Sequence, residues 1–213
     1  MTMPLRRSGA TERVEDVPVG RLPPGQLVPS AWPVEHYGRV PALDPATWDL
    51  RIFGATATGR EHSLDWSAFK GLPRTQVRAD LHCVTRFSVL DICWEGVSTA
   101  ALLALVPPAE GVRHVVIWAE YGYSANLRLS DFASEASLLA SHLEGEPIPP
   151  DRGSPLRLVV PHLYAWKGPK WVRAVEYRTS DRRGFWEERG YHNRADPWRE
   201  QRYAYEENSE DSA

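Results

Sequence analysis

The stretch from residue 75 to residue 83 alternates with a period of two, and no other feature constrains the fold of this chain so strongly. The positions that share one face of the expected strand are Thr75, Val77, Ala79, Leu81 and Cys83. This period is typical of a half-buried β-strand. Residues 84–88 break the alternation, so Cys83 is expected near the C-terminal end of the strand. A thiol there either fills the core, as buried free cysteines commonly do, or is held steady for chemistry by a rigid strand end.

Short strands and short helices are expected along the rest of the chain. The expected strands cover residues 48–53, 113–119, 123–129, 156–160 and 171–177, with a hairpin turn at Tyr121-Gly122. The expected helices are Trp66–Lys70 after an N-cap at Asp65, residues 98–106 up to Pro107-Pro108, and residues 130–136 capped by Ser130. The sequence shows no internal repeat and no obvious linker. A single α+β domain is therefore expected.

The two ends of the chain differ in composition from the middle. Residues 1–31 are rich in proline and charge with little periodicity, which indicates an N-terminal arm that is mobile or wraps the surface. Residues 32–184 carry the strand and helix patterns and are interpreted as the domain. Residues 185–213 form an aromatic-rich C-terminal extension, for which packing on or near the domain is favoured over a docking surface for a partner. Its aromatic side chains include Phe185, Trp186, Tyr191, Trp198 and Tyr203.

Composition narrows the functional classes. A hydrophobic content of 42% and a charged content of 25% are those of a globular protein. The net charge of −3 provides no basic footprint for nucleic acid. No apolar run reaches the ~18 residues of a membrane span. Arg6 and Arg7 resemble a twin-arginine export signal, but polar and acidic residues follow instead of an apolar core, so a cytoplasmic location is predicted.

Four sequence elements follow one another in an order that resembles a known family. They are W-P-V-E-H at residues 32–36 before Gly38 and Pro41, Cys83 with Trp94-x-Gly96 and the helix after it, G-E-P-I-P-P-D-R-G-S-P-L-R-L-V-V-P at residues 145–161, and Gly168-Pro169-Lys170. In this combination the chain resembles the sulfite-oxidase-like molybdopterin-dependent oxidoreductases. The resemblance is to the short bacterial members, which hold the catalytic molybdopterin domain only.

The resemblance implies a fold, a cofactor and a metal ligand. The fold is the α+β sulfite-oxidase molybdopterin-binding fold, with mixed sheets and a small barrel-like core. The cofactor is molybdopterin with molybdenum, and Cys83 is its ligand from the protein. A high-valent molybdenum centre accepts a soft thiolate, and metal coordination deprotonates a thiol. Cys93 has no partner at the spacing of a metal-binding pair and is interpreted as a core residue.

The resemblance also assigns the cofactor-binding positions. They are Trp32, Pro33, Val34, Glu35, His36, Ala119, Arg152, Arg157, Gly168, Pro169 and Lys170. Arg157, Lys170 and His36 are expected at the phosphate end of the pterin, where a guanidinium grips oxygens in a fork and an ammonium acts as a point charge. The alternative is a solvated, charged loop. Relatives carry Asn or His at the position of Arg152, so the role of this arginine stays open.

Two departures from the sulfite oxidases bear on the substrate. Those enzymes follow the ligand cysteine with two adjacent arginines, whereas this chain has the single Arg86. They also place a tyrosine before the proline-rich loop, where this chain has Ser141 followed by His142. Both changes weaken the case for sulfite. Arg86 and His142 are predicted as catalytic residues that bind an anion or deliver a proton.

The leading functional prediction is a two-electron oxygen-atom transfer on a small S-oxide or N-oxide, with the cofactor supplying the hard chemistry. The alternatives are sulfite oxidation and a non-catalytic molybdopterin-binding or interaction protein. No G-x-G-x-x-G fingerprint follows a strand, and no spacing of histidines and cysteines suits a haem or an iron–sulfur cluster. Electrons are therefore expected to be exchanged with a separate protein or a quinone-linked donor.

Overall fold

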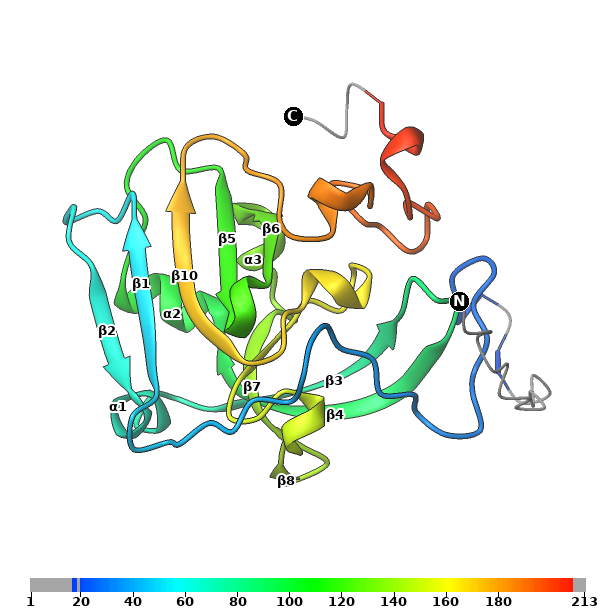
Figure 1. The fold of residues 1–213 in the computed structure, drawn as a ribbon, viewed down its shortest axis with the longest axis horizontal. Coiled ribbons are helices and arrows are strands. Elements are labelled where there is room, and N and C mark those ends of the chain that lie inside the picture. Colours follow the sequence, from blue (N-terminus) through cyan, green and yellow to red (C-terminus); the bar gives the residue numbers. More distant parts are fainter. Residues whose placement is uncertain (1–16, 19, 209–213) are drawn as a thin grey trace, which may run out of the picture.

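The computed structural model describes residues 17–18 and 20–208, which form two β-sheets with short helices (Figure 1). Arg6 and Arg7, which resemble a twin-arginine export signal, lie outside the described residues. In Figure 1 the first sheet stands on the left, and the long hairpin of the second sheet runs along the lower right. The C-terminal residues, coloured orange to red, lie above that hairpin.

The first sheet has the strand order β2-β1-β10-β5-β6. Its strands are β1 (Asp49–Gly54), β2 (His62–Asp65), β5 (His114–Ala119), β6 (Ser124–Arg128) and β10 (Val172–Arg178). β1 and β10 are parallel, with Arg51 opposite Ala174, and the other neighbours are antiparallel. The predicted hairpin between β5 and β6 is confirmed. Tyr121 and Gly122 at its turn have φ angles of 59° and 73°, which reverse the chain tightly.

The second sheet has the order β3-β4-β7-β8, with β9 paired to β7. Its strands are β3 (Thr75–His82), β4 (Ser88–Ser98), β7 (Leu138–Leu143), β8 (Glu146–Pro147) and β9 (Arg157–Val159). The strand before Cys83 is thus confirmed as β3. β4 was not predicted as a strand, because Asp91 has a φ of 57° and breaks its alternation. β4 crosses β7 so closely that a Cβ at Gly96 would collide with the carbonyl oxygen of Leu139.

The helices are short and sit at the ends of strands. They are α1 (Trp66–Lys70), α2 (Thr99–Leu105), α3 (Leu129–Phe132) and the 3₁₀ turns η1 (Glu120–Gly122), η2 (Pro150–Arg152), η3 (Ala165–Lys167), η4 (Glu187–Arg189) and η5 (Ala204–Glu206). The predicted N-cap at Asp65 is confirmed, because Asp65 Oδ1 accepts from the Ala68 amide at 2.7 Å. Ser98, expected as the first residue of its helix, is instead the N-cap of α2, and its Oγ accepts from the Ala101 amide at 3.1 Å. Such caps satisfy amide groups that the helix itself leaves unpaired.

The predicted cap of the third helix is wrong. Ser130 lies inside α3, and Arg128 occupies the N-cap position without a side-chain cap. Strand β6 continues to Arg128, so the helix begins directly from the strand. It ends at Phe132, because the Asp131 carbonyl accepts from Ser137 Oγ at 2.9 Å and fixes a turn there.

The main hydrophobic core lies between the two sheets. It combines Leu50 and Val115 of the first sheet, Val97 and Leu139 of the second, and Leu102 of α2. The expected α+β class with mixed sheets is confirmed. Over the described part of the chain, neither sheet closes on itself, so the barrel-like core takes the form of two open, packed sheets.

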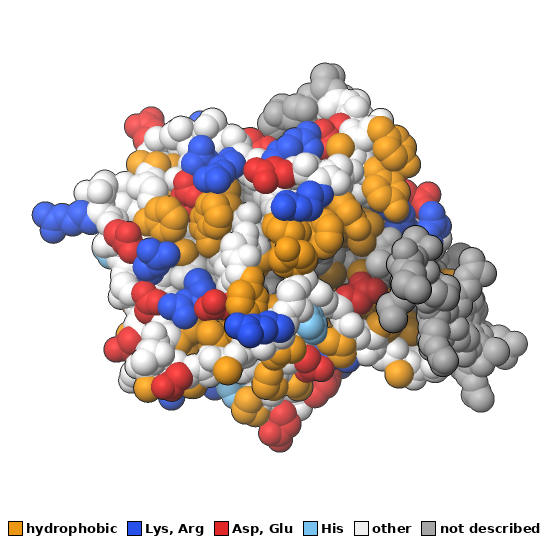
Figure 2. Space-filling model, in the orientation of Figure 1, with side chains coloured by type: hydrophobic (Ala, Val, Ile, Leu, Met, Phe, Trp, Pro, Cys, Tyr) orange, Lys and Arg blue, Asp and Glu red, His pale blue; other side chains and the backbone are white. Residues whose placement is uncertain are grey.

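The surface mixes charged and apolar side chains. On the face shown in Figure 2, hydrophobic side chains gather near the centre, and lysine, arginine and acidic groups are spread around them. Within residues 17–18 and 20–208, the helices are all too short or too polar to cross a membrane.

Candidate functional site

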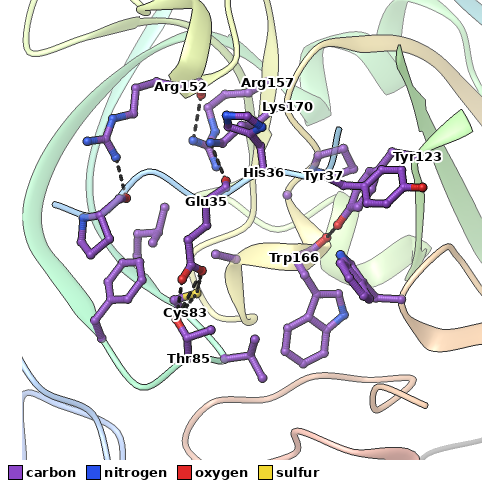
Figure 3. Close-up of a pocket in the computed structure, with 18 of the residues that line it drawn as sticks. Glu35, His36, Tyr37, Cys83, Thr85, Tyr123, Arg152, Arg157, Trp166 and Lys170 are labelled. Atoms are coloured by element: carbon purple, nitrogen blue, oxygen red, sulfur yellow. Dashed lines mark hydrogen bonds between the residues drawn. The ribbon is translucent and has the colours of Figure 1, made fainter. Parts of the chain in front are cut away.

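One pocket collects residues from three distant parts of the chain. The segment at 32–37, the turn after β3 and the segment from 150 to 171 form most of its lining, and the C-terminal extension adds Trp186 and Tyr191. Its cavity volume is about 260 Å³. This is close to the lower end of the range of about 300–1,000 Å³ that is typical of small-molecule sites. Figure 3 shows cations at one end of this pocket, Cys83 at another, and aromatic rings facing both.

Cys83 is held at the base of a tight turn between β3 and β4. Its amide donates to the Phe87 carbonyl at 2.8 Å, and its carbonyl accepts from the Arg86 amide at 3.1 Å. Arg86 has a φ of 75°, which closes the turn. Gln26, from the predicted arm, donates its side-chain amide to the Cys83 carbonyl at 3.0 Å. The backbone around the thiol is therefore fixed from both sides.

The Cys83 thiol is buried but faces polar partners. Its Sγ donates to Glu35 Oε2 at 3.0 Å, and the Thr85 hydroxyl lies 3.1 Å from the same sulfur. Burial raises the pKa of the Cys83 thiol to about 12, and the nearby Glu35 carboxylate adds to this effect. A thiol of this kind stays protonated at neutral pH unless a metal ion takes the place of the proton.

Three cations form what we call the basic end of the pocket: Arg152, Arg157 and Lys170. Arg152 donates to the carbonyls of Trp32 and Pro33 at 2.7 and 3.0 Å. Its guanidinium also lies 4.1 Å from the centre of the Trp32 ring. The close approach of a cation to a tryptophan face is favourable. Arg152 thus joins the loop after β8 to the segment before β1.

Lys170 and Arg157 are held in a similar way by backbone carbonyls. Lys170 Nζ donates to the carbonyls of Glu35 and Asp151, each at 2.7 Å. Arg157 Nη1 donates to the Arg152 carbonyl at 3.0 Å, while its buried Nε has no hydrogen-bond partner within the described part of the chain. A buried donor without an acceptor is costly, and an anion in the pocket would relieve that cost.

The pKa values of Lys170 and Arg157 are lowered, so the charged forms of both side chains are disfavoured at the basic end. Burial, with repulsion from Arg157 and Arg152, lowers the pKa of Lys170 to about 7. Burial and the neighbouring Arg152 lower the pKa of Arg157 to about 10. Both shifts point the same way, because each charged form loses water and meets another cation. A bound phosphate would reverse both shifts.

The loop at Gly153 passes so close to Arg157 and Lys170 that a side chain at this position would crowd both of them. Gly153 has a φ of 120°, and a Cβ there would lie 3.0 Å from Arg157 Cβ and 3.1 Å from Lys170 Cβ. Glycine lets the loop pass close to both cations while adopting this conformation. The clustered cations, the unpaired Arg157 Nε and the Cys83 thiol together fit a molybdopterin, which offers a phosphate at one end and a metal at the other.

The comparisons with known proteins agree with this fit. The model of the oxidoreductase molybdopterin-binding domain matches residues 37–186. The chain belongs to this family. The expected sulfite-oxidase-like relationship is thereby confirmed, and the family implies a molybdopterin cofactor.

Individual relatives extend the comparison. The chain is 41% identical over 190 residues to the uncharacterized oxidoreductase YuiH of Bacillus subtilis strain 168, covering 88% of this chain and 94% of YuiH. It is 30% identical over 155 residues to the protein-methionine-sulfoxide reductase catalytic subunit MsrP of Gluconobacter oxydans strain 621H, covering 57% of this chain and 49% of MsrP. The match therefore spans about half the length of MsrP.

Among solved structures, the sulfane dehydrogenase SoxCD from Paracoccus pantotrophus is similar in fold. Its TM-score is 0.60 at 18% sequence identity, covering 66% of this chain and 40% of the SoxCD chain. Identity this low supports the fold alone. The two packed sheets described above thus correspond to the molybdopterin-binding fold that the sequence predicts.

Most cofactor-binding positions predicted for this molybdopterin-binding domain meet in the pocket. Those that line it are Trp32, Pro33, Glu35, His36, Arg152, Arg157, Gly168, Pro169 and Lys170, together with Cys83. Val34 and Ala119 do not belong to the described lining. Val34 is 43% exposed between two lining residues, and Ala119 is buried at the end of β5, where its amide donates to the Tyr123 carbonyl.

Arg86 and His142 are not brought to the described lining of the pocket. A Cβ at Gly25 would lie 2.8 Å from Arg86 Nη1, which places this guanidinium beside the predicted arm. His142 lies on β7, with its Nδ1 2.7 Å from Arg74 Nη2 and 3.0 Å from Ser141 Oγ. Their catalytic roles stay predictions of the sequence, and the structure gives them other neighbours.

Sequence reasoning missed an aromatic part of the lining. It consists of Tyr37, Phe87, Tyr123, Trp166, Trp171, Trp186 and Tyr191. Tyr123 donates its hydroxyl to the Trp166 carbonyl at 2.7 Å, which ties β6 to η3. Thr85 beside the thiol was also missed. The only sequence signal was the high density of aromatic residues after residue 164, which does not say where their rings point.

Proposed function

We propose that this chain is a molybdenum-dependent oxidoreductase that reduces a small, neutral S-oxide or N-oxide. One observation carries the proposal: the Cys83 thiol and the cations Arg157 and Lys170 open onto the same pocket. A molybdenum-molybdopterin needs both, a soft thiolate for its metal and fixed cations for its phosphate. Packing alone does not account for these cations, because burial disfavours their charged forms.

Each group of residues has a separate task. Cys83 would hold the molybdenum as a thiolate, while the basic end would hold the phosphate of the pterin. The cofactor supplies two-electron transfer of an oxygen atom. For a sulfoxide the overall change is R₂SO + 2e⁻ + 2H⁺ → R₂S + H₂O, so an external donor must provide the electrons and solvent the protons. The protein binds and orients the oxide.

The charges near Cys83 favour a neutral oxide over sulfite. The Glu35 carboxylate lies 3.0 Å from the Cys83 sulfur and would repel a doubly charged anion. The arginine and lysine side chains among the described lining residues are Arg152, Arg157 and Lys170, and all three belong to the basic end. Sulfite at the metal would therefore lack the cations that offset its loss of water.

The printed name of one relative agrees with this substrate class and suggests a partner. MsrP of Gluconobacter oxydans is named a protein-methionine-sulfoxide reductase catalytic subunit. A sulfoxide is an S-oxide, and a catalytic subunit works with another subunit. We extend both points to this chain: its electrons come from a separate electron-transfer protein or a quinone-linked donor. We also retain a cytoplasmic location as part of the proposal.

The test begins with metal and pterin analysis of the full chain, produced in cells that make molybdopterin. Molybdenum and pterin are expected in equal amounts. The same preparation is then given a reduced dye with dimethyl sulfoxide or trimethylamine N-oxide, and separately sulfite with an artificial electron acceptor. Turnover of the oxides should exceed turnover of sulfite.

Two outcomes would overturn the proposal. Protein without molybdenum and pterin would favour a structural or interaction role. Sulfite oxidation with kcat/KM of about 10⁴–10⁸ M⁻¹s⁻¹, the range usual for natural substrates, together with inert oxides, would reverse both the substrate class and the direction.

A further inference from the structure

We infer that Trp166, Trp186 and Tyr191, which we call the aromatic wall, bind the organic substituents of the oxide and make the enzyme selective for aryl and bulky alkyl oxides. The inference rests on the proposed function and deepens it, because it names residues that select the substrate. All three side chains line the same pocket as Cys83. Two of them come from the C-terminal extension, which the sequence alone does not connect with the site.

The aromatic wall is a continuous surface of rings. The ring centres of Trp166 and Tyr191 are 5.1 Å apart, and those of Tyr191 and Trp186 are 5.2 Å apart. Phe185 packs behind it, 5.2 Å from Trp186 and 4.4 Å from Tyr37. Contacts at these distances and tilts are favourable for aromatic pairs. Each ring is thus oriented by its neighbours rather than left free in solvent.

The polar groups of Trp166 are already used for internal hydrogen bonds. Trp166 Nε1 donates to Glu187 Oε1 at 3.0 Å, and the Trp166 carbonyl accepts from the Tyr123 hydroxyl at 2.7 Å. Trp166 therefore presents its ring to the pocket, while its donor points elsewhere. Such a surface binds apolar or polarisable groups, including the sulfur and aryl groups of a sulfide or sulfoxide.

A buried ion pair fixes the aromatic wall to the domain. Glu187 Oε1 lies 2.7 Å from Lys167 Nζ, and the two side chains are 0% and 1% exposed. Lys167 also donates to the carbonyl and the side-chain oxygen of Asn126 in β6, at 2.9 and 2.8 Å. Glu187 and Lys167 directly follow Trp186 and Trp166 in the chain. The pair therefore holds both tryptophans against the first sheet.

The contrast between the aromatic wall and the surroundings of Cys83 suggests how an oxide would be oriented. The polar S–O or N–O group is directed toward Cys83 and the Thr85 hydroxyl beside it, and the organic groups lie on the rings. Dimethyl sulfoxide is too small to use the rings well, whereas methyl phenyl sulfoxide has a flat ring to place there. Charged oxyanions gain nothing from the aromatic wall.

The test compares these two sulfoxides in the holoenzyme with a reduced dye. In Trp186→Leu, which removes the ring but keeps an apolar side chain, KM for methyl phenyl sulfoxide should rise about tenfold, as expected for the loss of one aromatic contact. Its KM for dimethyl sulfoxide and both kcat values should change less than about twofold. Tyr191→Leu should behave similarly. Trp198→Leu, which alters a 48% exposed tryptophan of the same extension, is the matched control.

A binding measurement separates this inference from the proposed function. Calorimetry of the oxidised holoenzyme with methyl phenyl sulfoxide requires no turnover. Binding that weakens in Trp186→Leu, in a protein that reduces neither sulfoxide, would support the aromatic wall and reject the proposed activity. Turnover with an unchanged ratio of the two KM values in both variants would reject the aromatic wall and keep the activity. Pterin content and circular dichroism of each variant must match the wild type, and Trp186→Phe, which keeps a ring, should restore KM.

Discussion

The basic end and the aromatic wall belong to one pocket but are built in different ways. At the basic end each cation is held by main-chain oxygens, such as those of Glu35 and Asp151 around Lys170. In the aromatic wall, side chains hold one another, and a buried ion pair supplies the anchor. The three cations fall within the residues matched by the family model, whereas Glu187 and Tyr191 lie beyond them. Trp166 and Trp186 still fall within the matched range, so the chain beyond it contributes Tyr191 and the anchoring Glu187 to the aromatic wall.

The largest effect is expected where the two regions meet, at Cys83. Cys83→Ala should abolish turnover and change the metal-centred absorption, because no other thiol lines the described pocket. The pterin can still retain molybdenum, so metal loss need not be complete. Cys93→Ala is the matched control, since Cys93 lies on β4 away from the lining, and it should keep both properties. Full activity of Cys83→Ala would refute the ligand assignment.

The anchor of the aromatic wall should matter most for stability. Glu187→Ala leaves Lys167 as an unpaired buried charge, so the free energy of unfolding should fall by about 3–5 kcal/mol. Glu188→Ala, at the exposed neighbouring position, should stay within about 0.5 kcal/mol of wild type. Urea unfolding of both variants measures the difference. Equal stabilities would mean that the ion pair does not hold the extension in place.

Removing a cation should weaken cofactor binding without touching the aromatic wall. One charged hydrogen bond contributes about 1.5–3 kcal/mol, so Arg157→Met or Lys170→Met should reduce cofactor affinity about 10- to 100-fold. The loss should grow with salt, which screens the remaining cations. Pterin content after extensive dialysis is the measurement. Trp186→Leu should retain its pterin, and wild-type content in both cation variants would show that the phosphate binds elsewhere.

The smallest expected effect is a pH dependence of stability and of cofactor affinity that arises from Lys170 at the basic end. The pKa of Lys170 is lowered from 10.5 to about 7, so between these values the unfolded chain binds more protons than the folded one. The stability of the cofactor-free protein should therefore rise with pH across this window. Cofactor affinity should move the other way and fall about tenfold between pH 6 and pH 8, because a neutral Lys170 no longer attracts phosphate.

Lys170→Met is the control for both trends, since it has no charge to lose. Unfolding and cofactor binding are measured from pH 6 to pH 9. In the wild type, stability should rise and cofactor affinity should fall as the pH increases, whereas Lys170→Met should show neither trend. If the curves of the two proteins are parallel, Lys170 does not titrate in this range.

Local sequence signals predicted the parts of the fold that depend on neighbouring residues. The cap at Asp65, the turn at Tyr121 and the strand before Cys83 each rest on a pattern within a few residues. The family motifs predicted that Cys83, Arg157 and Lys170 belong to one site. Spacing alone could not predict this, because Cys83 is distant from the other two residues in the sequence.

The remaining features depend on contacts between distant residues. The aromatic wall forms because Lys167 contacts both Glu187 and Asn126, which are distant from it in the chain, and no local pattern encodes these contacts. Strand β4 escaped prediction because the bulge at Asp91 hides its alternation. Arg86 was predicted as a catalytic residue because it follows Cys83 closely, yet the turn that holds the thiol directs this side chain toward Gly25.

The position of β10 has a consequence for how the molecule is assembled. β10 lies between β1 and β5, so it joins two hairpins that are otherwise separate, β1–β2 and β5–β6. Among the described residues it is also the last strand in chain order, so it is synthesised after the other four strands of this sheet. Until then both hairpins expose an unpaired edge, and isolated hairpins are only marginally stable. The first sheet can therefore form only after β10 has been synthesised, through a parallel pairing between distant segments, and folding of this domain should be slow and sensitive to aggregation before that step.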